Sequence, residues 1–250
     1  MPGKFIIIEG TDGSGKTTQL TLLKKWLEES GIKTKTLDFP QYDEFWGKMV
    51  GRFLRGEFGE LDDVNPYLPS VLFMLDQASQ SRRVQKWLKE GYYVLSNRYV
   101  QSSMAHQSAK FKTEKDQREY LKWLEDAAFK ELGLVKDDLT VVLYANPDIL
   151  RELSLKSRVR KKSYTITKDI AEDHATHQQD SARMYAKLCQ EKETWQLLNC
   201  MDEVGKLLPI ETIHQKLKEL VAGIFGIDGN LGNGKELNNT IDSKNQLKLV

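Results

Sequence analysis

The sequence has few cysteines, almost no net charge and no long hydrophobic run. Its two cysteines, Cys189 and Cys200, are too few for a disulfide framework or a zinc site. Lysine and arginine total 37 and aspartate and glutamate 36, and this net charge of +1 argues against a protein that holds nucleic acid by its overall field. The early apolar run, residues 5–8, is far too short for a signal peptide or a membrane span. We therefore expect a cytoplasmic protein with inert, reduced thiols and no membrane or nucleic-acid partner.

The rest of the composition is that of a folded protein. Hydrophobic residues make up 40% and charged residues 29%, which is typical of globular proteins and unlike disordered, collagen-like or membrane chains. The length of 250 residues suits one large domain, or a compact domain with a lid or tail, because domains usually have about 100–200 residues.

Short apolar segments alternate with helical patterns along the chain. The run at residues 5–8 ends in glycine-rich sequence, and from Lys16 leucines recur at helical spacing as far as the stop signal Gly31. We predict further strands at 33–39, 92–96 and 139–144, and further helices at 66–90, 115–132 and from near 170 towards 195. This alternation indicates an α/β fold with a parallel sheet.

Two segments differ from this pattern. Residues 151–168 contain seven basic side chains and one acidic one, so they can hold an anion, form a solvated face or bind nucleic acid. Beyond residue 222 the sequence is rich in Gly, Asn, Asp, Lys and Ser, and we expect a domain at 1–222 followed by a polar, flexible tail at 223–250. The alternative for the tail is a short ordered segment that docks through its apolar side chains, namely Ile224, Phe225 and Ile227.

A phosphate-binding loop lies between the first predicted strand and the first predicted helix. It matches G-x-x-x-x-G-K-[ST] from Gly10 to Thr17. Backbone N–H groups of such a loop, together with the positive end of the helix dipole, attract phosphate oxygens. Lys16 can bridge β- and γ-phosphates, and the Thr17 hydroxyl can ligate Mg²⁺. The expected ATP-binding residues are Gly10, Asp12, Gly13, Ser14, Gly15, Lys16, Thr17 and Thr18.

The loop by itself predicts a nucleotide and no particular reaction. A GTPase should have an N-K-x-D element that recognises the base, and the sequence has none. A motor ATPase should have an apolar strand that ends in Asp or Asp-Glu, whereas the strand at 92–96 continues into Asn97-Arg98-Tyr99. Small-molecule kinases therefore remain as the class to consider.

Between residues 4 and 222 the sequence resembles the thymidylate kinase family. The matching segments, in family order, are Glu9-Gly10-Thr11-Asp12, Gly13 to Thr18 with Gln19, Phe39-Pro40, Gly56-Glu57-Phe58-Gly59, Leu72-Phe73, Asn97-Arg98-Tyr99 with Ser102, Ala105 and Gln107, and Asp169-Ile170. The resemblance implies a P-loop NTPase fold of the nucleoside monophosphate kinase type, with a parallel sheet flanked by helices and a mobile lid. It also implies Mg²⁺-dependent transfer of the γ-phosphoryl group of ATP to dTMP, giving dTDP for dTTP synthesis, in a homodimer.

The resemblance assigns roles on the acceptor side. Phe73 is expected to stack on thymine, with packing in the core as the alternative. Arg98 is expected to hold the acceptor phosphate, with a surface ion pair as the alternative. His106 is expected beside the deoxyribose, although a histidine with no role is an equal alternative. The expected substrate-binding residues are Asp12, Phe39, Pro40, Gln41, Phe73, Gln77, Arg98, Ser103, His106 and Gln107.

The resemblance also implies where the catalytic cations lie. The family supplies an arginine to the transferred phosphoryl group from the loop or from the lid. Here the loop has Gly13 after Asp12, so we expect the arginine to come from the lid, at residues 154–169. The expected catalytic residues are Lys16, Asp12 and Arg98, with Arg158 and Arg160 as the lid candidates.

Three amides stand where the family usually has charged side chains. Asn97 replaces an aspartate, and Gln41 and Gln77 replace arginines. An amide at 97 has no negative charge for Mg²⁺-bound water or for the acceptor phosphate, so either Asp12 takes over the role or turnover is low. We therefore keep several alternatives: a kinase with an altered pyrimidine monophosphate acceptor, a nucleotide-binding regulator without transfer activity, a deoxynucleoside kinase, and a nucleic-acid-binding protein.

Overall fold

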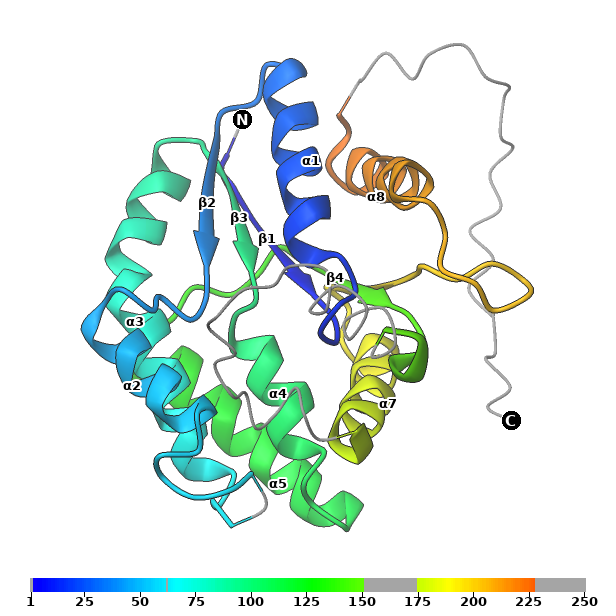
Figure 1. Cartoon of the computed structure of the whole chain (residues 1–250). Coiled ribbons are helices and arrows are strands. Elements are labelled where there is room, and N and C mark those ends of the chain that lie inside the picture. Colours follow the sequence, from blue (N-terminus) through cyan, green and yellow to red (C-terminus); the bar gives the residue numbers. More distant parts are fainter. Residues whose placement is uncertain (1, 62, 151–174, 228–250) are drawn as a thin grey trace.

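Strands and helices alternate throughout the computed structural model, which describes residues 2–61, 63–150 and 175–227 (Figure 1). The strands are β1 (Lys4–Glu9), β2 (Thr34–Asp38), β3 (Tyr93–Asn97), β4 (Leu139–Tyr144) and β5 (Trp195–Asn199). The helices are α1 (Lys16–Glu29), α2 (Phe45–Leu54), α3 (Tyr67–Lys89), α4 (Val100–Ser108), α5 (Glu114–Glu125), the π-helical segment η1 (Asp126–Glu131), α7 (Ala175–Glu191) and α8 (Ile210–Phe225).

The five strands form one parallel sheet in the order β2-β3-β1-β4-β5. β1 lies in the middle, paired with β3 through Ile8↔Asn97 and with β4 through Glu9↔Val142. Because all strands run in the same direction, their carboxyl ends meet at one edge, which is where open α/β sheets bind ligands. The P-loop follows β1 at this edge, so the predicted α/β fold with a parallel sheet is confirmed.

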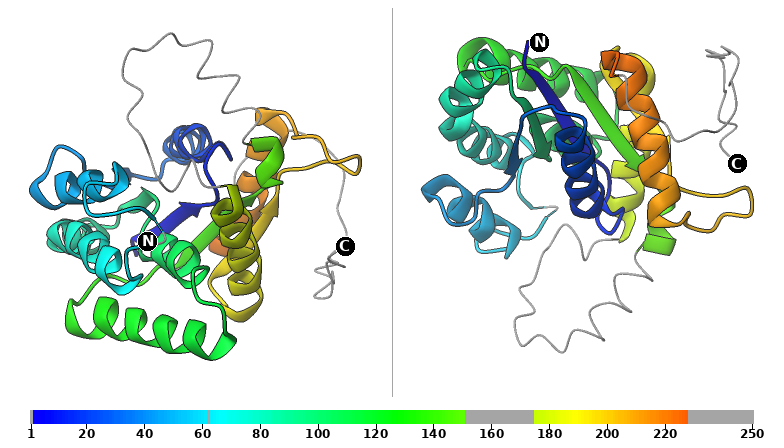
Figure 2. Two further views of the ribbon diagram at one scale, coloured as in Figure 1. Left: turned by 60° about the horizontal axis from the view of Figure 1, so that its bottom comes forward. Right: turned by 90° about the horizontal axis from the view of Figure 1, so that it is seen from above.

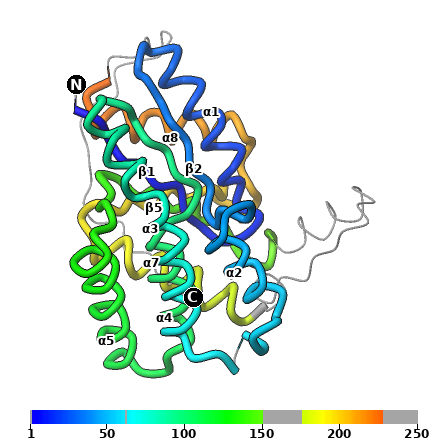
Figure 3. The backbone as a smooth tube through the Cα atoms, turned by 90° about the vertical axis from the view of Figure 1, so that its left-hand side faces the viewer, coloured from blue at the N-terminus to red at the C-terminus, as the bar shows by residue number. Residues whose placement is uncertain are grey.

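Each face of the sheet carries its own hydrophobic core. Successive side chains of a strand point to opposite faces, so Ile6 and Ile8 pack with α1 and α8 while Phe5 and Ile7 pack with α3, α4, α5 and α7. Figures 2 and 3 show these two helical layers on either side of the sheet. The four apolar side chains of β1, Phe5 to Ile8, are fully buried, which explains the unbroken apolar run in the sequence.

The end of α8 lies beyond the predicted domain boundary at residue 222. The helix continues to Phe225, whose ring packs edge-on against Tyr93 with a centroid distance of 5.7 Å, and Ile227 also packs on the core. Gly226 ends the helix in the left-handed conformation, with φ of 61°. The first residues assigned to the tail therefore belong to the fold, and residues 228–250 lie outside the described part.

Other boundaries also differ from the sequence-based expectation. The helix expected to run towards Trp195 ends at Glu191, and Trp195 instead begins β5 at the edge of the sheet. The pattern at 115–132 is helical but changes from α5 to the π-helical segment η1 after residue 125. α2 was not predicted. The basic segment 151–168, with the expected lid at 154–169, lies outside the described residues.

Candidate active site

The P-loop wraps closely around the start of α1. Gly10, Gly13 and Gly15 all have positive φ, and a Cβ atom at Gly10 would lie 2.5 Å from the Leu143 carbonyl oxygen, so no larger residue fits there. Lys16 folds back over the loop, where its Nζ donates to the carbonyl oxygens of Gly10 and Thr11, each at 3.0 Å.

The loop has features that suit an anion. Burial and the charge of Arg98 lower the pKa of Lys16 to about 8, so a nearby phosphate would stabilise its ammonium form. The hydroxyl of Ser14 is buried and has no hydrogen-bond partner among the described residues. Both observations fit a polyphosphate bound at the N-terminus of α1. Thr17 and Thr18 are exposed on the first turn of this helix.

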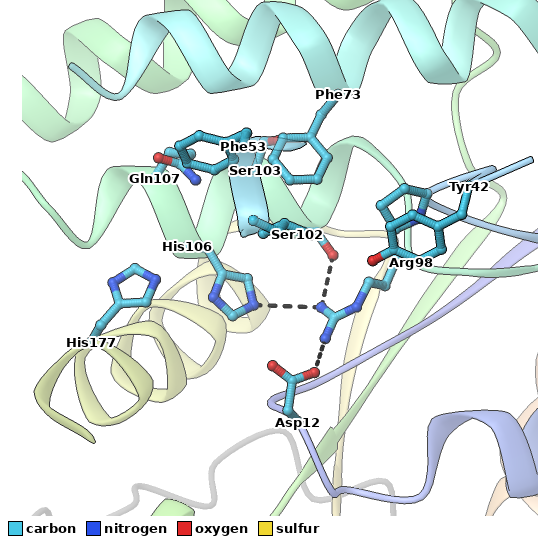
Figure 4. Close-up of a pocket in the computed structure, with 12 residues that line it drawn as sticks. Asp12, Tyr42, Phe53, Phe73, Arg98, Ser102, Ser103, His106, Gln107 and His177 are labelled. Carbon is cyan, nitrogen blue, oxygen red and sulfur yellow. Dashed lines mark hydrogen bonds and ion pairs between the residues drawn. The ribbon is translucent and has the colours of Figure 1, made fainter. Parts of the chain in front are cut away.

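Arg98 lies directly after β3 in the left-handed conformation, with φ of 63°, which no other non-glycine residue in the described ranges adopts. Its backbone N–H donates to the Ile8 carbonyl oxygen at 3.1 Å, which ties the turn to β1. Its guanidinium donates to Asp12 and to Ser102 Oγ at 3.2 Å, and lies 3.5 Å from His106 Nε2 (Figure 4). The strained backbone therefore directs a fixed guanidinium at the P-loop.

Asp12 bridges the two cations of the site. It pairs with Arg98 and lies 3.6 Å from Lys16 Nζ, and its other oxygen accepts from Gln178 Nε2 at 3.4 Å. Although burial opposes its ionisation, Arg98 and Lys16 hold the pKa of this carboxyl well below its usual range. Asp12 is therefore ionised at neutral pH.

A buried carboxylate, Glu9, lies beneath this cluster. Its side chain is fully buried and accepts from the Tyr99 backbone N–H at 3.0 Å, from Ser102 Oγ at 2.9 Å and from Tyr185 Oη at 2.7 Å. Arg98 Nη1 lies 3.9 Å away. Burial raises the pKa of Glu9, while Arg98, Tyr185, Ser102 and Lys16 act against this rise. Because all these neighbours donate, they fit an ionised Glu9.

A cavity of about 120 Å³ borders Arg98 and Asp12. The rings of Phe53 and Phe73 lie at one end, and Asp12 lies at the other (Figure 4). The two rings meet edge to face, with centroids 6.3 Å apart and an interplanar angle of 85°. The lining residues are Asp12, Pro40, Tyr42, Phe53, Leu54, Phe73, Arg98, Ser102, Ser103, His106, Gln107 and His177.

His106 is buried beside Arg98. Its ring centroid lies 5.5 Å from that of His177 and 5.6 Å from that of Tyr185. Burial and the charge of Arg98 lower the pKa of His106 well below its usual value, so the ring is neutral at physiological pH.

Some residues that the sequence predicted for the substrate site lie elsewhere. Phe39 is buried against Tyr99 in the core, with ring centroids 5.8 Å apart, and does not line the cavity. Gln77 is buried in α3 and is also absent from the lining. Gln41 lines a second cavity next to Thr17. Arg158 and Arg160 lie outside the described residues.

The second cavity lies beside the P-loop and has a volume of about 270 Å³. At its wall Asn97 Nδ2 donates to Asp38 Oδ1 at 2.7 Å, and Gln41 Nε2 donates to the Asp38 carbonyl oxygen at 2.6 Å. The lining residues are Thr17, Leu20, Thr36, Leu37, Asp38, Gln41, Arg83 and Asn97.

Sequence reasoning missed several residues that complete the site. Three of them come from α7: His177 packs near His106, Gln178 donates to Asp12, and Tyr185 donates to Glu9. Asp38 and Glu9 were also missed, although each stands at the carboxyl end of a strand, where a polar residue after a buried run is the available signal.

A parallel sheet with a P-loop after its central strand, and a pocket joined to that loop by an Asp–Arg pair, is the arrangement expected of a P-loop kinase. A family model described as thymidylate kinase matches residues 8–218. Thymidylate kinase from Mycobacterium tuberculosis is 30% identical over 185 residues, covering 74% of this chain and 85% of that protein. A probable thymidylate kinase from Thermococcus kodakarensis is 27% identical over 227 residues, covering 89% of this chain and 98% of the relative.

A solved structure supports the fold. Thymidylate kinase from Candida albicans superimposes with a TM-score of 0.64 at 22% identity, covering 89% of this chain and 92% of the other. The chain thus belongs to the thymidylate kinase family and is a nucleoside monophosphate kinase; this family phosphorylates dTMP. No helix in the described ranges is both long and apolar enough to cross a membrane.

Proposed function

We propose that the protein transfers the γ-phosphoryl group of ATP to dTMP with the help of Mg²⁺. The observation that supports this most is the position of Arg98. It joins the P-loop through Asp12 on one side and borders the aromatic pocket on the other. An acceptor phosphate held at Arg98 would face the γ-phosphate held by the loop, and positioning of this kind accounts for most of the catalysis in phosphoryl transfer.

The pocket suits a pyrimidine deoxynucleotide. Phe73 offers a ring face for the base, and Ser103 and Gln107 offer hydrogen bonds at the same end. His106 lies next to Arg98 in the wall of the pocket, so it would stand beside the sugar. The guanidinium of Arg98 is a planar donor that can hold a phosphate with two parallel hydrogen bonds.

On the donor side, Lys16 would bind the β- and γ-phosphates, and Ser14 would donate its unpaired hydroxyl to them. Thr17 would ligate Mg²⁺, which when bound supplies positive charge to the phosphate oxygens. Asp12 pairs with Arg98 and lies near Lys16, so it would hold both cations in fixed positions relative to each other.

The remaining expectations stay as part of this proposal. Arg158 or Arg160 would supply the lid cation, residues 1–222 would form the main part of the kinase domain, and the product would lead to dTTP in the cytoplasm. A homodimer is compatible with two exposed apolar side chains on α3, Leu68 and Val71, which sedimentation of the purified protein would test.

A substrate panel tests the proposed function. The rate of ADP formation from ATP should be highest with dTMP when dTMP, dUMP, UMP and CMP are compared as acceptors. Lys16→Ala should abolish phosphoryl transfer to every acceptor. Nucleotide binding without transfer to any of the four would contradict the proposal and favour a regulator. Full activity of Lys16→Ala would show that the loop does not carry the chemistry.

A second candidate, a kinase with an altered acceptor, rests on Gln77. This residue replaces an arginine of the family, yet it is buried and does not line the pocket. A base that meets only Phe73, Ser103 and Gln107 loses one determinant for thymine. A preference for dUMP or CMP over dTMP in the same panel would support this candidate.

A further inference from the structure

The carboxyl ends of β2 and β3 carry an acid and an amide that face each other. Asp38 and Asn97 are paired residues at the last position of the parallel ladder between these strands. P-loop enzymes hold Mg²⁺ with the loop Ser or Thr and with an aspartate at the end of a neighbouring strand. Here the strand beside β1 ends in Asn97, which has no charge, and the carboxylate stands one strand further out.

The hydrogen bond between the two side chains determines how each is oriented. Asn97 Nδ2 lies 2.7 Å from Asp38 Oδ1, and because a carboxylate only accepts, the amide nitrogen must face it. The amide oxygen then points away, and it is buried without a hydrogen-bond partner in the described ranges. This oxygen is an acceptor suited to a water molecule bound to a metal ion.

The Asp38 carboxylate is also available for a cation. It makes no ion pair with any residue that the structure describes, and it lines the same cavity as Thr17, the loop residue expected to ligate Mg²⁺. Arg83 lines this cavity too, but its guanidinium bonds Gln80 Oε1 at 3.3 Å and lies 4.6 Å from the Trp87 ring.

Asp12 is less suited to the same task. Its carboxylate already contacts Arg98 and lies 3.6 Å from Lys16, so two cations share its charge. A carboxylate compensated in this way attracts a further cation weakly.

We propose that Asp38 supplies the carboxylate for the Mg²⁺ site beside Thr17, and that Asn97 positions it. At this pair of strand ends the acid stands on β2 and the amide on β3, so the pair carries one negative charge and one hydrogen bond. This inference rests on the proposed function, because it concerns the metal that accompanies the nucleotide.

The test uses the full chain and measures ADP binding by calorimetry with and without Mg²⁺. The quantity of interest is the factor by which Mg²⁺ strengthens ADP binding. Asp38→Asn should reduce this factor about tenfold or more, as loss of groups around a bound metal commonly does. Its ADP affinity without Mg²⁺ should not fall, because a negative charge near the phosphates has been removed.

Two further variants separate the charge from its position. Asp38→Asn combined with Asn97→Asp returns one acid and one amide to the pair and should recover most of the Mg²⁺ effect. Glu29→Gln, the same type of change at an exposed residue at the other end of α1, should leave the effect unaltered. Thermal unfolding of each variant checks that the fold is intact.

An unchanged Mg²⁺ effect in Asp38→Asn would overturn the proposal, and so would a double variant that recovers nothing. Failure of the proposed function would appear differently. ADP and Mg²⁺ would still bind cooperatively and respond to Asp38→Asn, while none of the pyrimidine monophosphates would be phosphorylated.

Discussion

The buried hydrogen bond from Tyr185 to Glu9 gives a quantitative prediction. Tyr185 is 1% exposed and donates to a carboxylate oxygen at 2.7 Å. A hydrogen bond to a charged group contributes about 1.5–3 kcal/mol, so Tyr185→Phe should lower the free energy of unfolding by about 2 kcal/mol at pH 8. For a chain of this size that corresponds to a decrease in Tm of roughly 4–8 °C.

The pH dependence of this loss is the sharper test. The folded-state pKa of Glu9 is already raised above its ordinary value of 4.5 by burial, and loss of a donor raises it further. A carboxyl with a raised folded pKa binds its proton more tightly when folded, so stability falls as pH rises between the unfolded and folded pKa values. The loss caused by Tyr185→Phe should therefore grow from pH 5 to pH 8.

Tyr120→Phe is the matched control. Tyr120 is equally buried, but its hydroxyl contacts Ser70 Oγ at 2.7 Å and the Ser103 carbonyl oxygen at 3.2 Å, both neutral groups. Its removal should lower stability by about 0.5–1.5 kcal/mol, with little change between pH 5 and pH 8. Urea unfolding followed by tryptophan fluorescence measures both variants. A loss in Tyr185→Phe that is the same at every pH would refute an ionised Glu9 as its partner.

Two further predictions concern the pockets. Phe73→Ala should raise the KM for dTMP by about 5- to 150-fold, as expected for loss of about 1–3 kcal/mol of stacking, and leave the KM for ATP unchanged in steady-state kinetics; equal changes in both would indicate a structural role through Phe53. Asn97→Asp would replace the hydrogen bond from Asn97 Nδ2 to Asp38 Oδ1 with two carboxylates that repel each other, so thermal stability should fall below that of the natural protein. Unaltered thermal stability would contradict the contact between Asn97 and Asp38.

The sequence predicted the parts of the fold that depend on local patterns. The four buried apolar side chains of β1, the glycines of the loop and the leucines of α1 belong to one short stretch, so their arrangement followed from spacing alone. β5 was missed because Trp195 follows a long helical pattern closely, and only its pairing with Thr140 on β4 makes it a strand. Pairing of this kind is not visible in a local window.

The site could be predicted only in part, because its contacts join distant residues. Tyr185 and Glu9 are 176 positions apart, and Asn97 and Asp38 are 59 apart. The motif indicated Lys16 and the family resemblance indicated Arg98, but neither indicated that Glu9 would lie beneath both or that α7 would contribute three side chains. Gln77 was expected at the base because it stands one turn after Phe73, yet tertiary packing buries it.

The three amides that replace family charges are not equivalent. Asn97 donates to the Asp38 carboxylate, and Gln41 donates to the Asp38 carbonyl oxygen. An ionised aspartate at position 97 could not donate to Asp38, so the Asn97 contact favours a site built around Asp38 over a site that has lost its chemistry. Gln77 differs, because its side-chain oxygen is buried without a hydrogen-bond partner in the described ranges. A change in acceptor preference is therefore expected to originate near Gln77, whereas the metal and phosphate side retains one carboxylate beside Thr17.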